Sequence, residues 1–340
     1  MTQGGARGRP RSAESAELTR EVFEQLLQAA VAAPSMHNTQ PWRFRVRQAS
    51  RTIELRADPA RQLPYSDPDG RAVHIACGAA VFNLRLAAAV AGWQASVLLL
   101  PDAGTPLLLA TIRLGGRYRV GVAERELHAA IEQRHTNRQP FSSRSVPPGV
   151  LAEMAEAARL EGAILHIPDH DESVRLLHLA ADAERDLLTD LRYLAELARW
   201  TGGQRDREGI PDSALGPRSP EGSAPVRDFT PGPRSQPVRY AWFETTPQLA
   251  VLSMRSGTKA DWLRAGQALQ RVLLTATARG ISASPLTQPL ETRDAWLVRD
   301  PRYESEQPQM ILRLGYGLPL PQPPAPHRPI GDILDEPEPD

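Results

Sequence analysis

The spacing of apolar residues predicts two helices and four strands in the first part of the chain. Residues 42–48 and 52–58 alternate apolar with polar side chains, the pattern of two paired strands with one face in water. Residues 16–32 and about 70–91 repeat apolar positions at helical spacing, and Gly92 is expected to cap the second helix. Two further strands are expected in the segments SVLLL and LLLATIRLG.

The same pattern begins again later in the chain. Two of the matching helices also carry glycines at equivalent positions, Gly78 with Gly266 and Gly92 with Gly280. Three ordered matches of the same element types predict an internal duplication. The gap-free matches pair the segments starting at Val22 and Val150 (offset 128), Cys77 and Ala265 (offset 188), and Thr111 and Ile311 (offset 200).

The jump in offset from 128 to 188 indicates an insertion of about 60 residues in the second half. It is expected to contain a long helix over 171–201 and a Pro/Gly-rich stretch over 202–239. A stretch of this kind is either disordered or an active-site cover, and as a cover it would rest Phe229 over the pocket. The expected plan is a flexible N-terminus (1–14), a first half (15–122), a second half with the insertion (123–320), and a Pro-rich surface arm (321–340).

Composition narrows the class of function. Forty basic and forty acidic residues cancel, so no net field recruits nucleic acid or a membrane surface. The single cysteine, Cys77, excludes an intrachain disulfide and is expected to be a buried, inert thiol. Neither a signal peptide nor an apolar run of about 20 residues is recognised. A cytoplasmic protein is therefore expected.

Residues 33–42, APSMHNTQPW, form a corner between the first helix and the first strand that is rich in proline and polar side chains. Later segments read EQRHTNRQPF from Glu132, ADWLRAGQALQRVLLTATARGIS, ILRLGYG and HRPIGDIL. As an ordered set they resemble the nitroreductase family, whose members bind FMN. The chain is most similar to the internally duplicated, fused Acg-type proteins of actinobacteria.

This resemblance implies an α+β fold in which two tandem nitroreductase-like halves form a pseudo-dimer within one chain. Family members are normally homodimers with FMN at the subunit interface, so the duplicated chain is expected to be a monomer or a weak homodimer. The insertion falls where Acg-type proteins carry a lid over the flavin pocket. NAD(P)H and small nitroaromatic or quinone acceptors are the implied partners.

The resemblance also implies the cofactor-binding residues. Arginine suits the FMN phosphate because its planar guanidinium donates two parallel hydrogen bonds. The flavin carries the redox chemistry itself, so neither a catalytic side chain nor a metal ion is expected. The implied residues are Arg134, Thr136, Arg138 and Arg328 for the phosphate, Pro34, Ser35, Met36, Asn38 and Gln40 for the ribityl chain and ring, and Gly280, Ile281 and Ser282 beside the reactive nitrogen.

Each of these residues also has an ordinary structural interpretation. Without the flanking family segments, a solvated surface that caps a helix is the favoured interpretation of Arg134 and Arg138. Ser35 and Asn38 suit helix-end caps, and Gly280 suits a plain helix C-cap. His37 is interpreted as a bystander, because no nucleophile is paired with it in the sequence.

The two halves do not carry equivalent motifs. The second half has RLEGAIL where the first has the polar corner, and the first half lacks an arginine segment 128 residues before Arg134. One FMN per chain is therefore expected. The functions left open are NAD(P)H-dependent reduction of nitro compounds or quinones through FMN, flavin storage under a lid that blocks substrates, and a scaffold without flavin.

Overall fold

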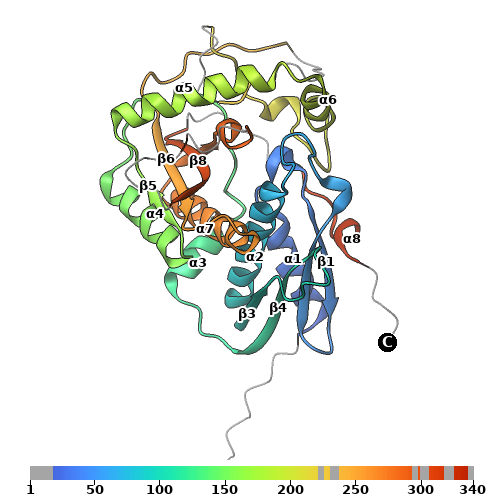
Figure 1. Ribbon diagram of the computed structural model, residues 1–340. Coiled ribbons are helices and arrows are strands. Elements are labelled where there is room, and N and C mark those ends of the chain that lie inside the picture. Colours follow the sequence, from blue (N-terminus) through green and yellow to red (C-terminus); the bar gives the residue numbers. More distant parts are fainter. Residues whose placement is uncertain are drawn as a thin grey trace, which may run out of the picture.

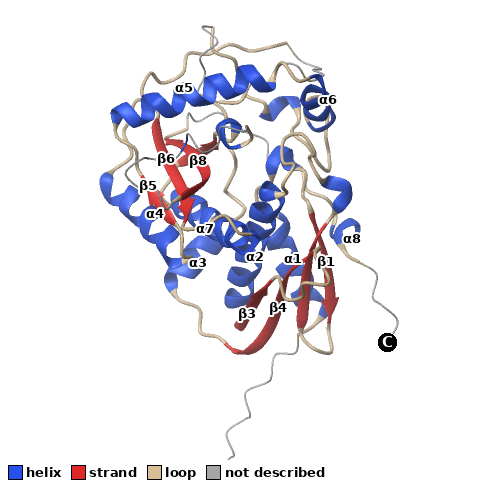
Figure 2. Ribbon diagram, viewed as in Figure 1, coloured by secondary structure: helices blue, strands red, loops and turns tan. Residues whose placement is uncertain are grey.

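The computed structural model describes residues 18–220, 226–229, 237–292, 298, 306–317 and 325–335. Within these residues the chain has an α+β fold with two four-stranded antiparallel sheets, shown as red arrows in Figure 2. The expected flexible N-terminus, 1–14, lies outside the described residues, as do parts of the stretch 202–239 and of the arm 321–340.

The first half follows the predicted pattern. Its sheet has the order β1-β2-β4-β3, and β1 pairs with β2 in antiparallel register, as the alternating segments predicted. Phe44, Ile53 and Leu55 are fully buried between this sheet and the helices. The elements are α1 (Arg20–Val31), β1 (Trp42–Arg47), β2 (Thr52–Ala57), α2 (Arg71–Val90), β3 (Trp93–Leu99) and β4 (Leu108–Arg117).

The second half repeats this plan after α3 (Val122–Ala129). Its sheet has the order β5-β6-β8-β7, which is the order of the first sheet with each strand replaced by its counterpart. The predicted duplication is thereby confirmed at the level of topology. The elements are α4 (Pro148–Leu160), β5 (Ile164–His166), β6 (Gln248–Met254), α7 (Lys259–Ala278), β7 (Ser282–Pro285) and β8 (Gln307–Gly315).

Helices α2 and α7 pack against each other at the centre of the molecule (Figure 1). A Cβ atom on Gly78 would lie 2.1 Å from the carbonyl oxygen of Leu263, and one on Gly266 would lie 2.0 Å from that of Ile75. The offset of 188 relates Gly78 to Gly266 and Ile75 to Leu263, so each glycine contacts the counterpart of the residue that its own counterpart contacts. Contacts across a two-fold dimer interface are reciprocal in the same way. The α2–α7 crossing is therefore the internal pseudo-dimer interface.

Helix α2 corrects one expectation from the sequence. It is long and apolar enough to cross a membrane, although no such stretch was recognised, but 89% of its apolar window is buried inside the protein. Its apolarity is explained by packing against α1, the first sheet and α7. Cys77 on this helix is fully buried, as expected, and burial raises the pKa of its thiol.

The insertion forms two helices rather than the single helix expected over 171–201. These are α5 (His170–Leu187) and α6 (Leu191–Trp200). The break occurs because Asp190 caps α6, its side chain accepting a hydrogen bond of 2.8 Å from the backbone N–H of Arg192. Described residues of the following stretch bury a small apolar cluster with α6, which consists of Tyr193, Leu197, Ile210, Leu215 and Phe229.

The C-terminal arm is only partly a surface feature. It was expected to lie along the surface, yet Arg328 and Ile333 are buried. After α8 (Ile330–Ile333), the backbone N–H of Asp335 donates a 2.8 Å hydrogen bond to the carbonyl of Phe44 on β1. Figure 1 shows α8 beside β1, so the chain returns from the second half to the edge of the first sheet.

Candidate functional site between the two halves

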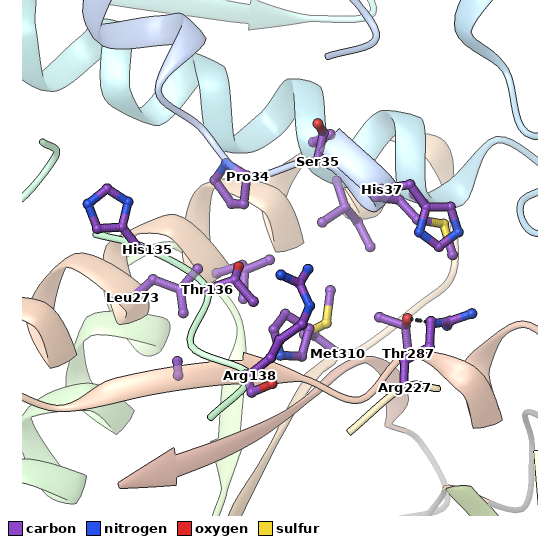
Figure 3. A pocket seen from close by; sticks show the side chains of 18 of the residues that line it. Pro34, Ser35, His37, His135, Thr136, Arg138, Arg227, Leu273, Thr287 and Met310 are labelled. Atoms are coloured by element: carbon purple, nitrogen blue, oxygen red, sulfur yellow. Dashed lines mark hydrogen bonds between the residues drawn. The ribbon is translucent and has the colours of Figure 1, made fainter. Parts of the chain in front are cut away.

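A cavity of about 120 Å³ lies between the halves. Its walls come from the corner after α1, from α2 and α7, from β7, and from the insertion. The apolar part of the wall is formed by Ile75, Ala76, Leu269, Leu273 and Met310. In Figure 3, His135 and Arg227 lie at opposite ends of this cavity.

Two arginines of the expected phosphate segment line the cavity without a carboxylate partner. Arg134 donates a 3.4 Å hydrogen bond to the carbonyl of Ala32, and its buried Nε has no partner. Arg138 donates to the carbonyl of Ala214 at 3.0 Å. Burial lowers the pKa of both guanidinium groups to about 10, yet both stay charged at neutral pH. Among the described residues neither forms an ion pair, so both guanidinium groups face the cavity without a carboxylate partner.

The arginine segment owes its position to the second sheet. Thr136 forms a parallel bridge with Ala283 at β7, and the backbone N–H of Asn137 donates to the carbonyl of Ala283 at 3.0 Å. Thr136 also lines the cavity. This extra pairing holds the segment along β7, and four of its residues line the cavity: Arg134, His135, Thr136 and Arg138.

The corner adopts an unusual backbone. His37, Asn38 and Gln40 have φ values of 50°, 55° and 51°, in the left-handed region that non-glycine residues rarely adopt. The hydroxyl of Ser35 accepts a 2.9 Å hydrogen bond from the backbone N–H of Gln40, which closes the turn. Pro34, Ser35 and Met36 line the cavity, as the resemblance implied.

Asn38 and Gln40 hold other segments of the chain instead of lining this cavity. The Asn38 amide donates to the carbonyls of Gly209, at 3.1 Å, and Pro326, at 2.8 Å. The Gln40 amide donates to the carbonyl of Arg207 at 2.7 Å and accepts from the backbone N–H of Arg328 at 2.8 Å. The corner therefore fastens both the insertion and the C-terminal arm.

The segment implied beside the reactive nitrogen lies outside the cavity wall. Gly280, with φ of 71°, follows the end of α7, and Ile281 is buried in the hydrophobic core of the second half. The Ser282 hydroxyl accepts a 3.2 Å hydrogen bond from Asn137. The residues of this chain that face the cavity come next in sequence: Ala283, Ser284 and Pro285.

Arg328 also points away from the cavity. It donates to the carbonyl of Asp332 at 2.6 Å and lies 3.7 Å from the carboxylate of Asp58. The preceding residue, His327, instead lines a second cavity. This second cavity shares Pro34, Ser35 and the arginine segment 134–138 with the first, apart from Asn137.

The insertion closes one side of the first cavity. Phe229 is 4% exposed, and its ring centre lies 5.3 Å from the Arg138 guanidinium carbon and 6.1 Å from the His37 ring centre. Arg227 is hydrogen-bonded to Tyr193, Thr287 and Glu291, which joins the insertion to the second half. Phe229 therefore lines the cavity, and the interpretation of this stretch as a cover stays a prediction.

Sequence reasoning missed several residues of the cavity wall. His37, interpreted as a bystander, lines the cavity; burial, with the charges of Arg227 and Arg138, lowers the pKa of its imidazole. Arg71, in the first turn of α2, also faces the cavity and donates to the carbonyl of Gln309 at 2.6 Å. The position of His37 within the corner motif could have indicated that it lines the cavity. No local sequence pattern indicated this for Arg71 or Arg227, or indicated that His327 lines the second cavity.

Comparisons with known proteins identify the family of this chain. The model of the nitroreductase family matches residues 10–69 and 131–316. "Putative NAD(P)H nitroreductase Rv3131" of Mycobacterium tuberculosis is 38% identical over 325 residues, covering 94% of this chain and 92% of that protein. "Putative NAD(P)H nitroreductase acg" of the same species is 32% identical over 328 residues, covering 93% and 96%.

Among solved structures, a nitroreductase with bound FMN from Desulfitobacterium hafniense is 13% identical with a TM-score of 0.41. The match covers 63% of this chain and 98% of that one. At this similarity the comparison adds nothing to the site residues.

Proposed function

The chain belongs to the nitroreductase family, and on that premise we propose that it binds one FMN between its two halves and acts as an FMN-dependent oxidoreductase. In this proposal NAD(P)H supplies electrons, and a nitro compound or a quinone accepts them. Bound FMN supplies the hydride and electron chemistry, so the residues of the chain bind, orient and shield it.

One observation carries the proposal: Arg134 and Arg138 face the cavity as charged groups without carboxylate partners. Uncompensated buried charge is costly, so two such groups at a cavity favour an anionic ligand. A phosphate monoester carries a charge of about −1.5 to −2 at neutral pH, which balances both guanidinium groups. The Thr136 hydroxyl adds a neutral donor in the same segment.

The rest of the cavity suits a planar aromatic ring. Leu269 and Leu273 of α7 and Ile75 of α2 supply an apolar wall, and Ser35 supplies a polar group at its edge. His37 has a buried Nε2 without a partner and a lowered pKa, so it presents a neutral imidazole to any ligand edge. These features support FMN over a purely polar ligand.

The alternative is flavin storage, and a specific observation favours it. Arg227 and Phe229 of the insertion form part of the cavity wall, and Phe229 packs against Arg138. Arg227 is fixed by three hydrogen bonds, and nearby Glu291, Tyr193 and Glu184 raise the pKa of its guanidinium. A cover held this firmly would exclude both nicotinamide and acceptor.

Two measurements test the proposal. Acid release of flavin from purified protein, counted against the chain, should give one FMN per chain. Two per chain, or none after incubation with FMN, would contradict it. Anaerobic addition of NADPH should then bleach the flavin rapidly if the protein is a reductase. Bleaching by dithionite alone would favour storage.

A further inference from the structure

The arm places His327 where the resemblance had implied an arginine. His327 lines the second cavity together with Arg134 and His135, while Arg328 is engaged by Asp58 and Asp332. The two residues flanking His327 are held by the corner: Asn38 donates to the carbonyl of Pro326, and Gln40 accepts from the N–H of Arg328. The side chain of residue 327 is thus aimed by hydrogen bonds on both sides.

The imidazole of His327 can donate a hydrogen bond into the cavity only when it is protonated. One ring nitrogen is hydrogen-bonded to the carbonyl of Val31, and Nδ1 is buried without a partner. A neutral ring that donates to Val31 carries a lone pair at Nδ1, which repels an anion. Only the protonated ring offers a second N–H at that atom.

We propose that His327, together with Arg134, completes the binding site for the flavin phosphate, and that protonation of His327 couples flavin binding to pH. This inference rests on the proposed FMN site and adds a ligand that the resemblance does not assign. The chemical class recognised is a phosphate monoester. Asn38 and Gln40 act as positioning residues, because they hold the backbone on either side of His327.

The electrostatic surroundings give the direction of the effect. Burial, Arg134 and His135 all lower the pKa of His327, so the ring is neutral at pH 7 when no anion is present. A dianion beside the ring raises that pKa, so binding takes up a proton. Affinity is then highest below the pKa of the free protein and falls as pH rises toward the pKa of the complex. The other titratable or charged groups lining this cavity are His128, Glu132, His135 and Arg138.

The test is a titration of the apoprotein with flavin, in which quenching of flavin fluorescence reports binding. It is repeated at pH values from about 6.5 to about 8.5, where the phosphate is mostly dianionic. For the unmodified chain we expect the Kd for FMN to rise by about tenfold across this range. This is the effect of a pKa of His327 that is about one unit higher in the complex than in the free protein. The Kd for riboflavin, which has the same ring but no phosphate, should stay within about twofold. Inorganic phosphate should compete with FMN and not with riboflavin.

Three variants separate a direct from a structural role. His327→Gln should bind FMN at all pH values about as weakly as the unmodified chain does at high pH, and His327→Lys should bind tightly at all of them. Gln40→Ala should reduce the pH dependence of FMN binding, whereas riboflavin binding by this variant should show the same flat pH profile as in the unmodified chain. Thermal unfolding of each variant verifies that the chain is folded.

The outcomes distinguish this inference from the proposed function. If the unmodified chain binds no FMN at any pH, both fail. If it binds FMN with a flat pH profile, or if His327→Gln keeps the profile of the unmodified chain, the role of His327 is wrong and the FMN site stands. Equal pH profiles for FMN and riboflavin would show that the phosphate is not the group recognised.

Discussion

The candidate site and its pseudo-symmetric counterpart share a backbone plan but differ in what fills them. The end of α1 and the middle of α7 face the candidate site, and the end of α4 and the middle of α2 occupy the equivalent place in the other half. Applying the sequence offsets, Leu273 of the cavity wall corresponds to Arg85, and Ala33 corresponds to Glu161.

At the counterpart, charged side chains take the place of the cavity wall. Glu161 accepts from Arg85 at 2.7 Å and from Arg271 at 2.9 Å, and Arg85 also donates to Gln267 at 2.8 Å. Both guanidinium carbons lie 5.6 Å from the ring centre of Phe82. Here the arginines have a carboxylate between them, whereas Arg134 and Arg138 have none.

The difference shows that symmetry of topology does not extend to symmetry of binding. The α2–α7 crossing is retained because close packing of two helices needs glycine on both. Side chains away from the crossing are free to diverge. The candidate site then presents arginines without carboxylate partners to a cavity, and the counterpart is filled by an ion-pair cluster.

The largest effect is expected at the α2–α7 crossing, which both halves share. Gly78→Ala and Gly266→Ala should each lower the free energy of unfolding by more than about 3 kcal/mol, because each new Cβ would overlap a backbone carbonyl of the partner helix. Urea or thermal unfolding measures this effect. Gly149→Ala, with no neighbouring atom within 4 Å and a helical position, is the matched control and should be neutral or stabilising. Clearly unequal losses at Gly78 and Gly266 would argue against a reciprocal interface.

The next effect separates the two sites. Arg134→Ala should weaken FMN binding by about tenfold to about a hundredfold, because a charged hydrogen bond contributes about 1.5 to 3 kcal/mol. The chain should remain folded. Arg85→Ala, the matched change at the counterpart, should leave FMN affinity unchanged. Equal FMN retention in Arg134→Ala and the unmodified chain would remove this residue from the site.

A smaller effect tests whether the insertion covers the candidate site. Phe229→Ala should speed FMN dissociation by roughly threefold to thirtyfold, since it removes a buried ring and a cation–π contact with Arg138 of about 1 to 2 kcal/mol. Stopped-flow fluorescence of flavin release measures this rate. Trp242→Ala, which removes an aromatic ring that is 68% exposed, is the control. Identical release from Phe229→Ala and Trp242→Ala would mean that residue 229 covers nothing.

The smallest effect is expected at the counterpart itself. Glu161→Gln should destabilise the chain by about 1 kcal/mol, because Arg85 and Arg271 are partly exposed and solvent compensates for much of the lost pairing. Flavin stoichiometry should stay at one per chain. A second FMN bound by Glu161→Gln would show that the ion-pair cluster alone blocks a latent site.

The sequence by itself determined the elements and their repetition. Periodicity is a local property, so α1, α2 and the first two strands could be placed within a few residues, and ordered matches then predicted the duplication. The residues predicted to bind the cofactor include several that line the cavity, namely Pro34 to Met36 and three of the arginine segment, Arg134, Thr136 and Arg138. The break between α5 and α6 was missed because a local capping preference at Asp190 overrode a continuous apolar stripe.

Tertiary structure alone decided which residue of each segment faces the site. His327 rather than Arg328, and Ala283 to Pro285 rather than Gly280 to Ser282, face a cavity. In the corner, left-handed residues turn the amides of Asn38 and Gln40 toward the insertion and the arm. Sequence patterns carry no information on such directions, because hydrogen bonds to segments up to 288 residues away set them.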